Sequence, residues 1–370
     1  MVKTWEYLMN IVRAQKIEND PSATAHKRYK PLVSVIVPAF NEAEIITQNL
    51  TRLCAYLQSL EQDYRWELLV INDGSRDATG EMAEAFARAR ENVRVLHHES
   101  NLNLGQALRT GFHQCRGDYV VTMDVDLSYS PDHIARMLQK LREHKCDVVL
   151  ASPYMAGGQC SNVPREREIL SRQANRYLSR MAPGNLATLT GMVRAYEGRF
   201  VRALQLKSTG MEINTEIIYK AQILNARIAE IPGHLNWEAQ EPGGARRVSH
   251  MKILRHLGRC LFSGFVFKPA FALMLPALFA GVIACCAFGR ILFETIAQYQ
   301  AGFASAGFGM MQLWAAFRAA FQHEPHTFWI GSIGGLAALQ FFSFSLMALQ
   351  NKYYFEELFF STHELIKDMP

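Results

Sequence analysis

The sequence lacks the features that mark secreted or zinc-binding proteins. Its seven cysteines are scattered over 370 residues and never form a Cys-x-x-Cys pair. This spacing argues against both a disulfide framework and a zinc site, and it fits a chain that faces a reducing cytosol. Residues 1–20 carry several charged side chains and no continuous apolar core, so we expect no secretory signal there.

Missing features also disfavour two other classes of protein, those that bind a nicotinamide dinucleotide and those that bind nucleic acid. No Gly-x-Gly-x-x-Gly motif follows the first apolar run, so a nicotinamide dinucleotide site has no support. The formal net charge is only +5, and no basic stripe with stacking aromatic residues persists along the chain. We therefore expect no nucleic-acid partner.

Charge is absent from two long stretches near the C-terminus. Residues 269–289 and 327–350 carry no charged side chain, and each run is long enough to cross a hydrocarbon core of about 30 Å. We predict a membrane domain at residues 269–370 with two transmembrane helices, at about 269–290 and 327–350. The alternative is a buried helical hairpin in a soluble protein.

The positions of the basic residues predict how these helices are oriented. Residues 238–268 interleave basic and apolar side chains, which predicts a juxtamembrane amphipathic helix on an anionic membrane surface. The connection 290–326 contains only two basic residues, Arg290 and Arg318. The positive-inside rule then predicts a multi-pass protein of the inner or plasma membrane, with residues 1–268 and both termini in the cytoplasm. Residues 1–30 are expected to form an amphipathic helix and a linker.

Residues 31–237 alternate short apolar runs with helical patterns. Such alternation predicts βαβ units and an α/β domain with a mostly parallel sheet. The expected strands are residues 33–38, 67–71, 93–96, 118–123, 147–151 and 227–231.

Acidic residues follow three of the predicted strands. Glu42 and Asp73 come after the first two, and Asp124 and Asp126 end the fourth. Ligands of parallel sheets bind beyond the carboxyl ends of the strands, and two carboxylates there can hold a hard divalent cation that binds a diphosphate. The alternative for one Asp-x-Asp is a loop acid plus a helix-capping acid, but three acid-bearing strand ends favour the cation site.

A polar helix is predicted at residues 163–182. Arg167, Ser171 and Asn175 are spaced four residues apart and therefore share one helix face. Arginine suits forked recognition of phosphate, so this face could line the path of a phosphate. A solvated polar face is the alternative.

The chain resembles the membrane-anchored family-2 glycosyltransferases of the polyprenyl-phosphate branch, which is similar to dolichol-phosphate mannose synthase. The resemblance covers about residues 33–260 and implies a Rossmann-like GT-A catalytic domain at residues 31–237. Five motifs match in the family's order: residues 33–42, 72–75, 101–111, 124–128 and 164–175.

The resemblance implies roles for the matched residues. It implies Mg²⁺ or Mn²⁺ held by Asp124 and Asp126, with Ser128 as an unsettled third ligand. Residues implied on the nucleotide-sugar donor side are Pro38, Phe40, Glu42, Asp73, Asn101 and Arg109. Residues implied near the lipid phosphate are Arg167, Arg172, Ser171 and Asn175. Arg246 and Arg247 are expected to bind the donor diphosphate.

Two departures from the family pattern affect the acceptor side. Pro153 stands where members of the family often carry an arginine that helps to hold the lipid phosphate, and Arg165 or Arg172 could substitute for it. The usual acid before the Gly-x-x-Arg-Ala-Tyr run is missing, and Ala187 or Thr188 stands there.

The expected reaction is inverting transfer of a hexose from GDP-mannose or a UDP-sugar to polyprenyl or dolichyl phosphate. The product would be a lipid-linked sugar donor for cell-envelope glycan or protein glycosylation. An attacking phosphate is already anionic, so no strong general base is needed. Two alternatives stay open: transfer to a lipid hydroxyl with Glu212 or Glu216 as base, and a non-catalytic nucleotide-sugar-binding scaffold. The sequence does not decide between a monomer and a homo-oligomer.

Overall fold

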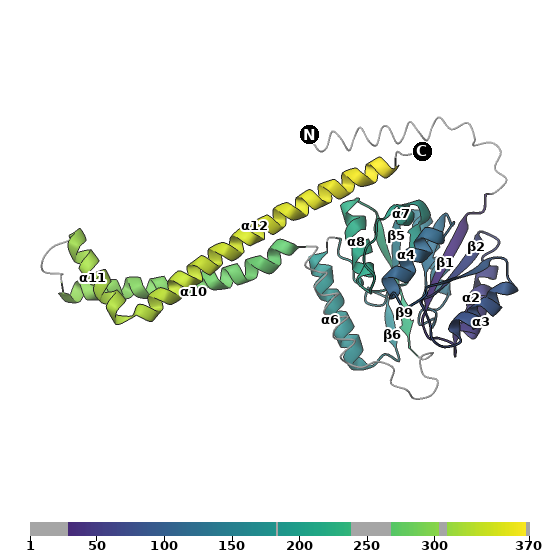
Figure 1. The fold of residues 1–370 in the computed structure, drawn as a ribbon, viewed down its shortest axis with the longest axis horizontal. Coiled ribbons are helices and arrows are strands. Elements are labelled where there is room, and N and C mark those ends of the chain that lie inside the picture. The colour runs from purple at the N-terminus through teal and green to yellow at the C-terminus, as the bar shows by residue number, and fades with distance from the viewer. Residues whose placement is uncertain (1–28, 183, 238–267, 303–308, 368–370) are drawn as a thin grey trace.

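The computed structural model describes residues 29–182, 184–237, 268–302 and 309–367. Residues 29–237 of this set form an α/β unit, and the remaining residues form long helices that project from it (Figure 1). The amphipathic segments expected within residues 1–28 and 238–267 lie outside the described residues.

The main sheet of the α/β unit has seven strands. In spatial order they are β3 (Val93–His97), β2 (Arg65–Asn72), β1 (Leu32–Ala39), β4 (Tyr119–Thr122), β7 (Arg194–Glu197), β5 (Val148–Ser152) and β8 (Ile228–Pro232). Only β7 runs antiparallel to its neighbours β4 and β5. The mostly parallel sheet predicted from the sequence is confirmed.

Helices cover both faces of this sheet and create two hydrophobic cores. One core lies under α2 (Ile46–Ser59), α3 (Thr79–Arg88) and α5 (Asp132–His144). The other lies under α4 (Leu104–Gln114), α6 (Arg165–Met181), α7 (Gly198–Ala203) and α8 (Ile213–Ile223). Strands buried on both faces need mostly apolar residues, which explains their long apolar runs. The strand order reverses between β1 and β4, so a crevice for ligands is expected beyond their carboxyl ends.

A second, two-stranded sheet was not predicted. It pairs β6 (Gln159–Ser161) in parallel with β9 (His234–Asn236). The Asn236 N–H also donates to the Ser128 carbonyl at 2.8 Å. Three-residue strands are too short to show a periodicity, yet this pair ties the segments before α6 and after β8 to the predicted metal motif.

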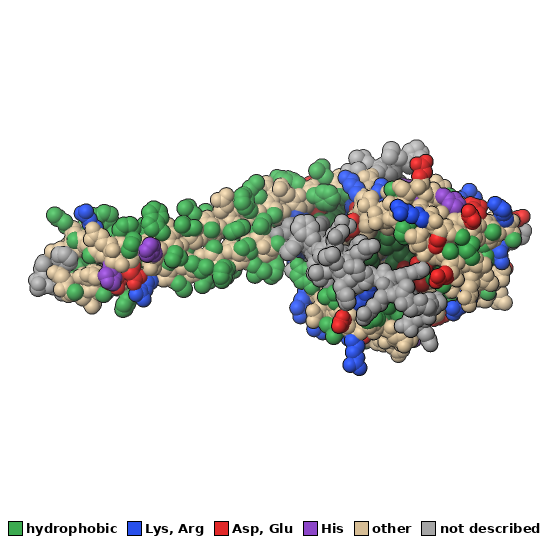
Figure 2. All heavy atoms as spheres, turned by 60° about the horizontal axis from the view of Figure 1, so that its bottom comes forward, with side chains coloured by type: hydrophobic (Ala, Val, Ile, Leu, Met, Phe, Trp, Pro, Cys, Tyr) green, Lys and Arg blue, Asp and Glu red, His purple; other side chains and the backbone are tan. Residues whose placement is uncertain are grey.

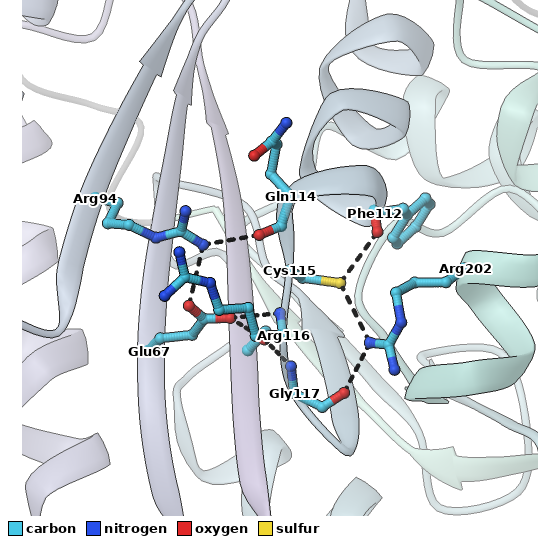
Figure 3. A network of polar contacts seen from close by, with 9 residues as sticks. Glu67, Arg94, Phe112, Gln114, Cys115, Arg116, Gly117 and Arg202 are labelled. Carbon is cyan, nitrogen blue, oxygen red and sulfur yellow. Dashed lines mark hydrogen bonds and ion pairs between the residues drawn. The ribbon is translucent and has the colours of Figure 1, made fainter.

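A buried polar network holds β2 near the start of the strand, away from the carboxyl edge of the sheet (Figure 3). Oε1 of Glu67 accepts from the Ser34 hydroxyl at 2.5 Å and from the Arg116 N–H at 2.7 Å. Its Oε2 pairs with Arg94 at 3.1 Å. The Ser34 hydroxyl in turn accepts from the Gly117 N–H at 2.8 Å. One carboxylate therefore joins β1, β2, β3 and the turn before β4.

Replacing Glu67 by Ala should destabilise the chain by about 2–4 kcal/mol, because buried donors and a cation lose their acceptor. Thermal unfolding of the purified chain in detergent measures this. Glu91→Ala, at an exposed acid, is the matched control. Equal unfolding midpoints for the two variants would show that the network adds no stability.

The projecting helices are α10 (Pro269–Gly302), α11 (Met310–His323) and α12 (Pro325–Lys367), which we call the helical stalk. Two of them, over residues 270–302 and 325–361, are long and apolar enough to cross a membrane. A Cβ on Gly334 would lie 3.3 Å from the Ala280 carbonyl oxygen, so a small residue permits close packing of α12 on α10. The predicted spans lie within these helices, but α12 continues well beyond residue 350 and α11 was not predicted.

Side chains on the surface of the stalk are mostly hydrophobic, and charged ones gather towards its far end (Figure 2). Arg290 of α10 pairs with Glu324 at 2.5 Å, and Glu294 lies 3.5 Å from His323. These pairs join the second half of α10 to the junction of α11 and α12.

Candidate active site

The two aspartates lie directly beyond the central strand β4. The Met123 N–H still donates to the Ile36 carbonyl at 3.0 Å, so the sheet ends immediately before Asp124. The Asp124 side chain is half-buried. Burial, followed by repulsion from Asp126, raises the pKa of Asp124 to about 8. A bound cation would relieve both effects, so the pair fits a divalent metal.

The turn after these carboxylates is strained and tightly held. Oδ1 of Asp126 accepts from the Ser128 N–H at 2.8 Å, and the Asn49 amide donates to the Val125 carbonyl at 3.0 Å. Leu127 adopts a φ of 51°, in the left-handed region that a bulky residue rarely enters. Strain of this kind persists where the surroundings impose a shape, often at a ligand site.

The donor set suits a cation that is shared with a diphosphate. Within the described ranges, no third His, Cys, Asp or Glu joins the two aspartates in a metal-holding group. Magnesium commonly uses one or two carboxylates and takes its other ligands from phosphates and water. Ser128 is buried beside the pair and remains the predicted third protein ligand.

Asp73 ends β2 at the same edge and is almost fully buried. Its Oδ1 accepts from the Leu102 N–H at 2.9 Å and lies 2.7 Å from Nδ1 of His98. The other nitrogen of this ring lies 2.9 Å from the hydroxyl of Thr110 on α4. His98 was not among the predicted site residues, because it comes close to Asp73 only in the folded chain. It fixes the orientation of the carboxylate predicted to bind the base.

The other predicted donor-side residues lie around the ends of β1 and α4. Phe40 is 40% exposed just beyond β1, as a surface for a planar base would require, and Pro38 is half-buried. The Glu42 N–H donates to the Thr79 hydroxyl at 2.7 Å. Asn101 is exposed before α4. Arg109 donates to the Gln106 side chain at 2.9 Å, and its buried Nε has no hydrogen-bond partner among the residues that the structure describes.

The four predicted acceptor residues lie on α6 but have different surroundings. The Arg167 guanidinium lies 4.7 Å from the ring centroid of Trp237, and burial lowers its pKa. Arg172 pairs with Glu168 at 2.7 Å and lies 5.4 Å from the ring of Tyr154. Arg167 and Arg172 thus each contact an aromatic ring that comes from outside α6.

Ser171 and Asn175 face other protein groups. The Ser171 side chain hydrogen-bonds Tyr154. Asn175 is buried, and its Oδ1 accepts from the Leu189 and Thr190 N–H groups at 2.8 and 3.2 Å. Asn175 therefore holds the segment 187–192, which we call the loop wall. Its predicted contact with substrate stays a prediction, as does that of Arg246 and Arg247, which lie outside the described residues.

The loop wall lies beside the two aspartates and is held by residues that the sequence did not indicate. Thr122, two positions before Asp124, donates its hydroxyl to the Met192 carbonyl at 2.6 Å. The Glu230 carboxylate on β8 accepts from the Ala187 and Thr188 N–H groups at 2.8 and 2.9 Å. An acid from another strand thus bonds the backbone of the two positions where the usual acid is missing.

The buried side chain of Arg194 also holds the loop wall. The Arg194 guanidinium is fully buried and donates to the Gly191 and Leu189 carbonyls at 2.8 and 2.7 Å. It also donates to the Asn214 carbonyl on α8 at 2.8 Å. Burial lowers the pKa of Arg194, and the Glu230 charge is one of the groups that oppose this.

Comparison with known proteins gives consistent matches to one family. The sequence model of glycosyl transferase family 2 matches residues 34–204. An undecaprenyl-phosphate mannosyltransferase of Micrococcus luteus is 33% identical over 206 residues, which cover 54% of this chain and 82% of that protein. A polyprenol monophosphomannose synthase of Mycolicibacterium smegmatis is 30% identical, and the match covers 60% of this chain and 82% of that protein.

A more distant relative and a solved structure cover a similar share of the chain. A dolichol-phosphate mannosyltransferase of Pyrococcus furiosus is 27% identical, over 62% of this chain and 63% of that protein. The structure of glucosyl-3-phosphoglycerate synthase from Mycobacterium tuberculosis with Mn²⁺, UDP and phosphoglyceric acid is 18% identical with a TM-score of 0.48. The match covers 64% of this chain and 78% of the chain in that structure.

Proposed function

This chain belongs to glycosyl transferase family 2, and we propose that it transfers mannose from GDP-mannose to a polyprenyl phosphate, with inversion. The observation that carries the proposal is the pair Asp124 and Asp126 at the strand-order reversal, with Asp73 at the same edge. The names of three relatives at 27–33% identity favour mannose and a polyprenyl-type acceptor. A UDP-sugar is the second donor class.

On the donor side, the chain's residues bind and orient the nucleotide. Asp73, fixed by His98 and the Leu102 N–H, presents a carboxylate to the base. Asp124 and Asp126 would hold Mg²⁺ or Mn²⁺, which neutralises the leaving diphosphate when bound. Because two anions must be brought together, positioning and charge neutralisation account for most of the expected catalysis.

On the acceptor side, the exposed guanidinium of Arg172 is the best-placed substitute for the arginine replaced by Pro153. It lies over the ring of Tyr154, the residue directly after that proline. Arg167 lies on the same helix, five residues earlier. Arginine provides planar, forked donors that match phosphate oxygens, so the two residues are proposed to hold the lipid phosphate.

Transfer to a lipid hydroxyl is disfavoured by the surroundings of Glu216, one of its two proposed bases. Burial raises the pKa of Glu216, but hydrogen bonds from Lys220 and from the Ser208 and Lys207 N–H groups lower it overall below the usual value. A carboxylate with a lowered pKa and several fixed donors is a weak base. A phosphate acceptor needs no such base.

The membrane arrangement follows from the stalk. We propose that α10 and α12 cross the membrane, that residues 290–326 connect them outside, and that the catalytic domain (31–237) and both termini lie in the cytoplasm. The basic segment 238–268 is then at headgroup height, where a phosphate on a long lipid arrives.

Replacing Arg167 by Ala should raise the KM for polyprenyl phosphate by about tenfold to a hundredfold, because a charge-assisted contact to phosphate is lost. The affinity for GDP-mannose should stay within about twofold. Steady-state kinetics with each substrate varied in turn measures both. A loss of donor affinity with an unchanged lipid KM would place Arg167 on the donor side. Arg180→Ala, at the other end of α6, is the control.

A further inference from the structure

The last helix of the stalk returns to the α/β unit. α12 has 43 residues and is therefore about 65 Å long, about twice what a hydrocarbon core of about 30 Å requires. Its C-terminal part runs along α7 and α8 (Figure 1). Phe355 stacks on Tyr219 with ring centroids 6.5 Å apart. The Tyr219 hydroxyl donates to Glu356 at 3.4 Å. The surplus length of α12 thus forms an intramolecular contact.

Lys220 of α8 is the residue that this contact covers. Its Nζ lies 5.2 Å from the ring centroid of Phe359, and its side chain is only 6% exposed. The same Nζ pairs with Glu216 at 2.6 Å and donates to the Gln205 carbonyl. Aromatic faces attract cations more strongly where water is excluded. α12 therefore completes the surroundings of a buried ion pair.

Glu216 connects the ion pair to the segment 205–210. Its two carboxylate oxygens accept from the Lys207 and Ser208 N–H groups at 2.9 and 2.8 Å. Both bonds are charge-assisted and therefore among the stronger hydrogen bonds in proteins. The position of the ion pair thus determines the position of the segment 205–210.

The segment 205–210 in turn holds the start of α4. The Thr209 carbonyl accepts from the Gly105 and Gln106 N–H groups at 2.7 and 3.2 Å, which otherwise have no partner at a helix N-terminus. A Cβ on Gly105 would lie 2.5 Å from the Thr209 carbonyl carbon, so only glycine permits this approach. The Leu102 N–H just before α4 donates to Asp73, the predicted base-binding carboxylate.

We propose that docking of α12 on α8 positions the donor side of the active site, through the Lys220–Glu216 pair and the segment 205–210. Glu216 and Lys220 act as positioning residues, since their contacts are to other protein groups, in the segment 205–210 and on α12. The proposal rests on the proposed function only in naming the ligand of that site as a nucleotide sugar. A chain in which α12 is displaced should hold the start of α4 less firmly.

Hydrogen exchange of the full-length protein in lipid nanodiscs, without donor, tests the coupling. Phe359→Ala and Glu216→Gln should each speed amide exchange at residues 104–108 by about fivefold, because local opening becomes easier. Tyr354→Ala, an aromatic residue on the opposite face of α12 that is 56% exposed, should leave it unchanged. Unchanged exchange in Phe359→Ala would overturn the proposal, even if Glu216→Gln responds.

Kinetics with GDP-mannose connects the coupling to the site. Phe359→Ala should raise the KM for GDP-mannose by about fivefold and leave the KM for polyprenyl phosphate unchanged. An equal rise in both KM values would indicate a general structural effect and contradict the proposal. If the wild-type protein transfers no sugar, the proposed function fails, whereas the exchange experiment still decides the coupling.

Discussion

Replacing Asp126 by Ala is expected to lower the rate of sugar transfer by about a thousandfold. Without this carboxylate the site loses one of the two carboxylates proposed to hold the cation, and charge stabilisation by a bound cation contributes several kcal/mol to a transition state. Asp124→Asn should have a similar effect, since burial, followed by repulsion from Asp126, raises the pKa of a carboxylate that a bound cation would stabilise. Transfer of labelled mannose to lipid measures both variants.

Removal of the metal should reproduce this loss in the unaltered protein. Chelation is expected to abolish transfer, and added Mn²⁺ or Mg²⁺ should restore it. Asp63→Ala, at an exposed acid before β2, is the control for the substitutions. Full transfer by Asp126→Ala in the presence of chelator would contradict the metal role of the pair.

Replacing Glu230 by Ala is expected to lower the use of polyprenyl phosphate by about a hundredfold. The Ala187 and Thr188 N–H groups lose their acceptor, and the buried Arg194 loses a nearby negative charge. The loop wall beside Asp124 would then shift, and a displacement of about 1 Å near reacting groups can cost about a hundredfold in rate.

Conservative substitution separates this positioning role from a general loss of stability. Glu230→Gln keeps one oxygen acceptor and should recover part of the activity, whereas donor affinity should stay near the wild-type value in both variants. Glu99→Ala, at an exposed acid, should behave as wild type. Equal losses of donor and acceptor affinity in Glu230→Ala would show that Glu230 acts on the whole fold.

The strands and their order along the chain could be predicted because of how the sheet is buried. Helices cover both of its faces, so runs such as Val35–Val37 are apolar at every position. The acids at the strand ends follow from the same geometry. Asp73 and Asp124 lie at the same edge because parallel strands bring their carboxyl ends to one side of the sheet.

Contacts between distant segments could not be predicted from local patterns. Glu230 bonds residues more than 40 positions away, and His98 reaches Asp73 only because β2 and β3 are neighbours. The periodicity of α6 correctly places Asn175 in line with Arg167 on a helix. It does not indicate that the loop wall packs on the asparagine, whose amide groups are engaged there.

The length of α12 shows a further limit of composition. The charged residues after residue 350 interrupt the apolar run, so the predicted span ends there. The helix continues because Lys352 and Glu356 pair one turn apart at 3.4 Å, and because Phe355 and Phe359 pack on α8. Hydropathy reports the membrane-spanning part of a helix, and the docking part depends on tertiary contacts.

The most direct test of the proposed function is a transfer assay with purified full-length protein. Radiolabelled GDP-mannose and Mn²⁺ are supplied with either undecaprenyl phosphate or undecaprenol, and label in the extracted lipid is counted. We predict label only in the phosphate lipid, with the anomeric configuration opposite to that of the donor, and none with Asp126→Ala. Equal labelling of the alcohol, or no labelled lipid with GDP-mannose or any UDP-sugar, would contradict the account.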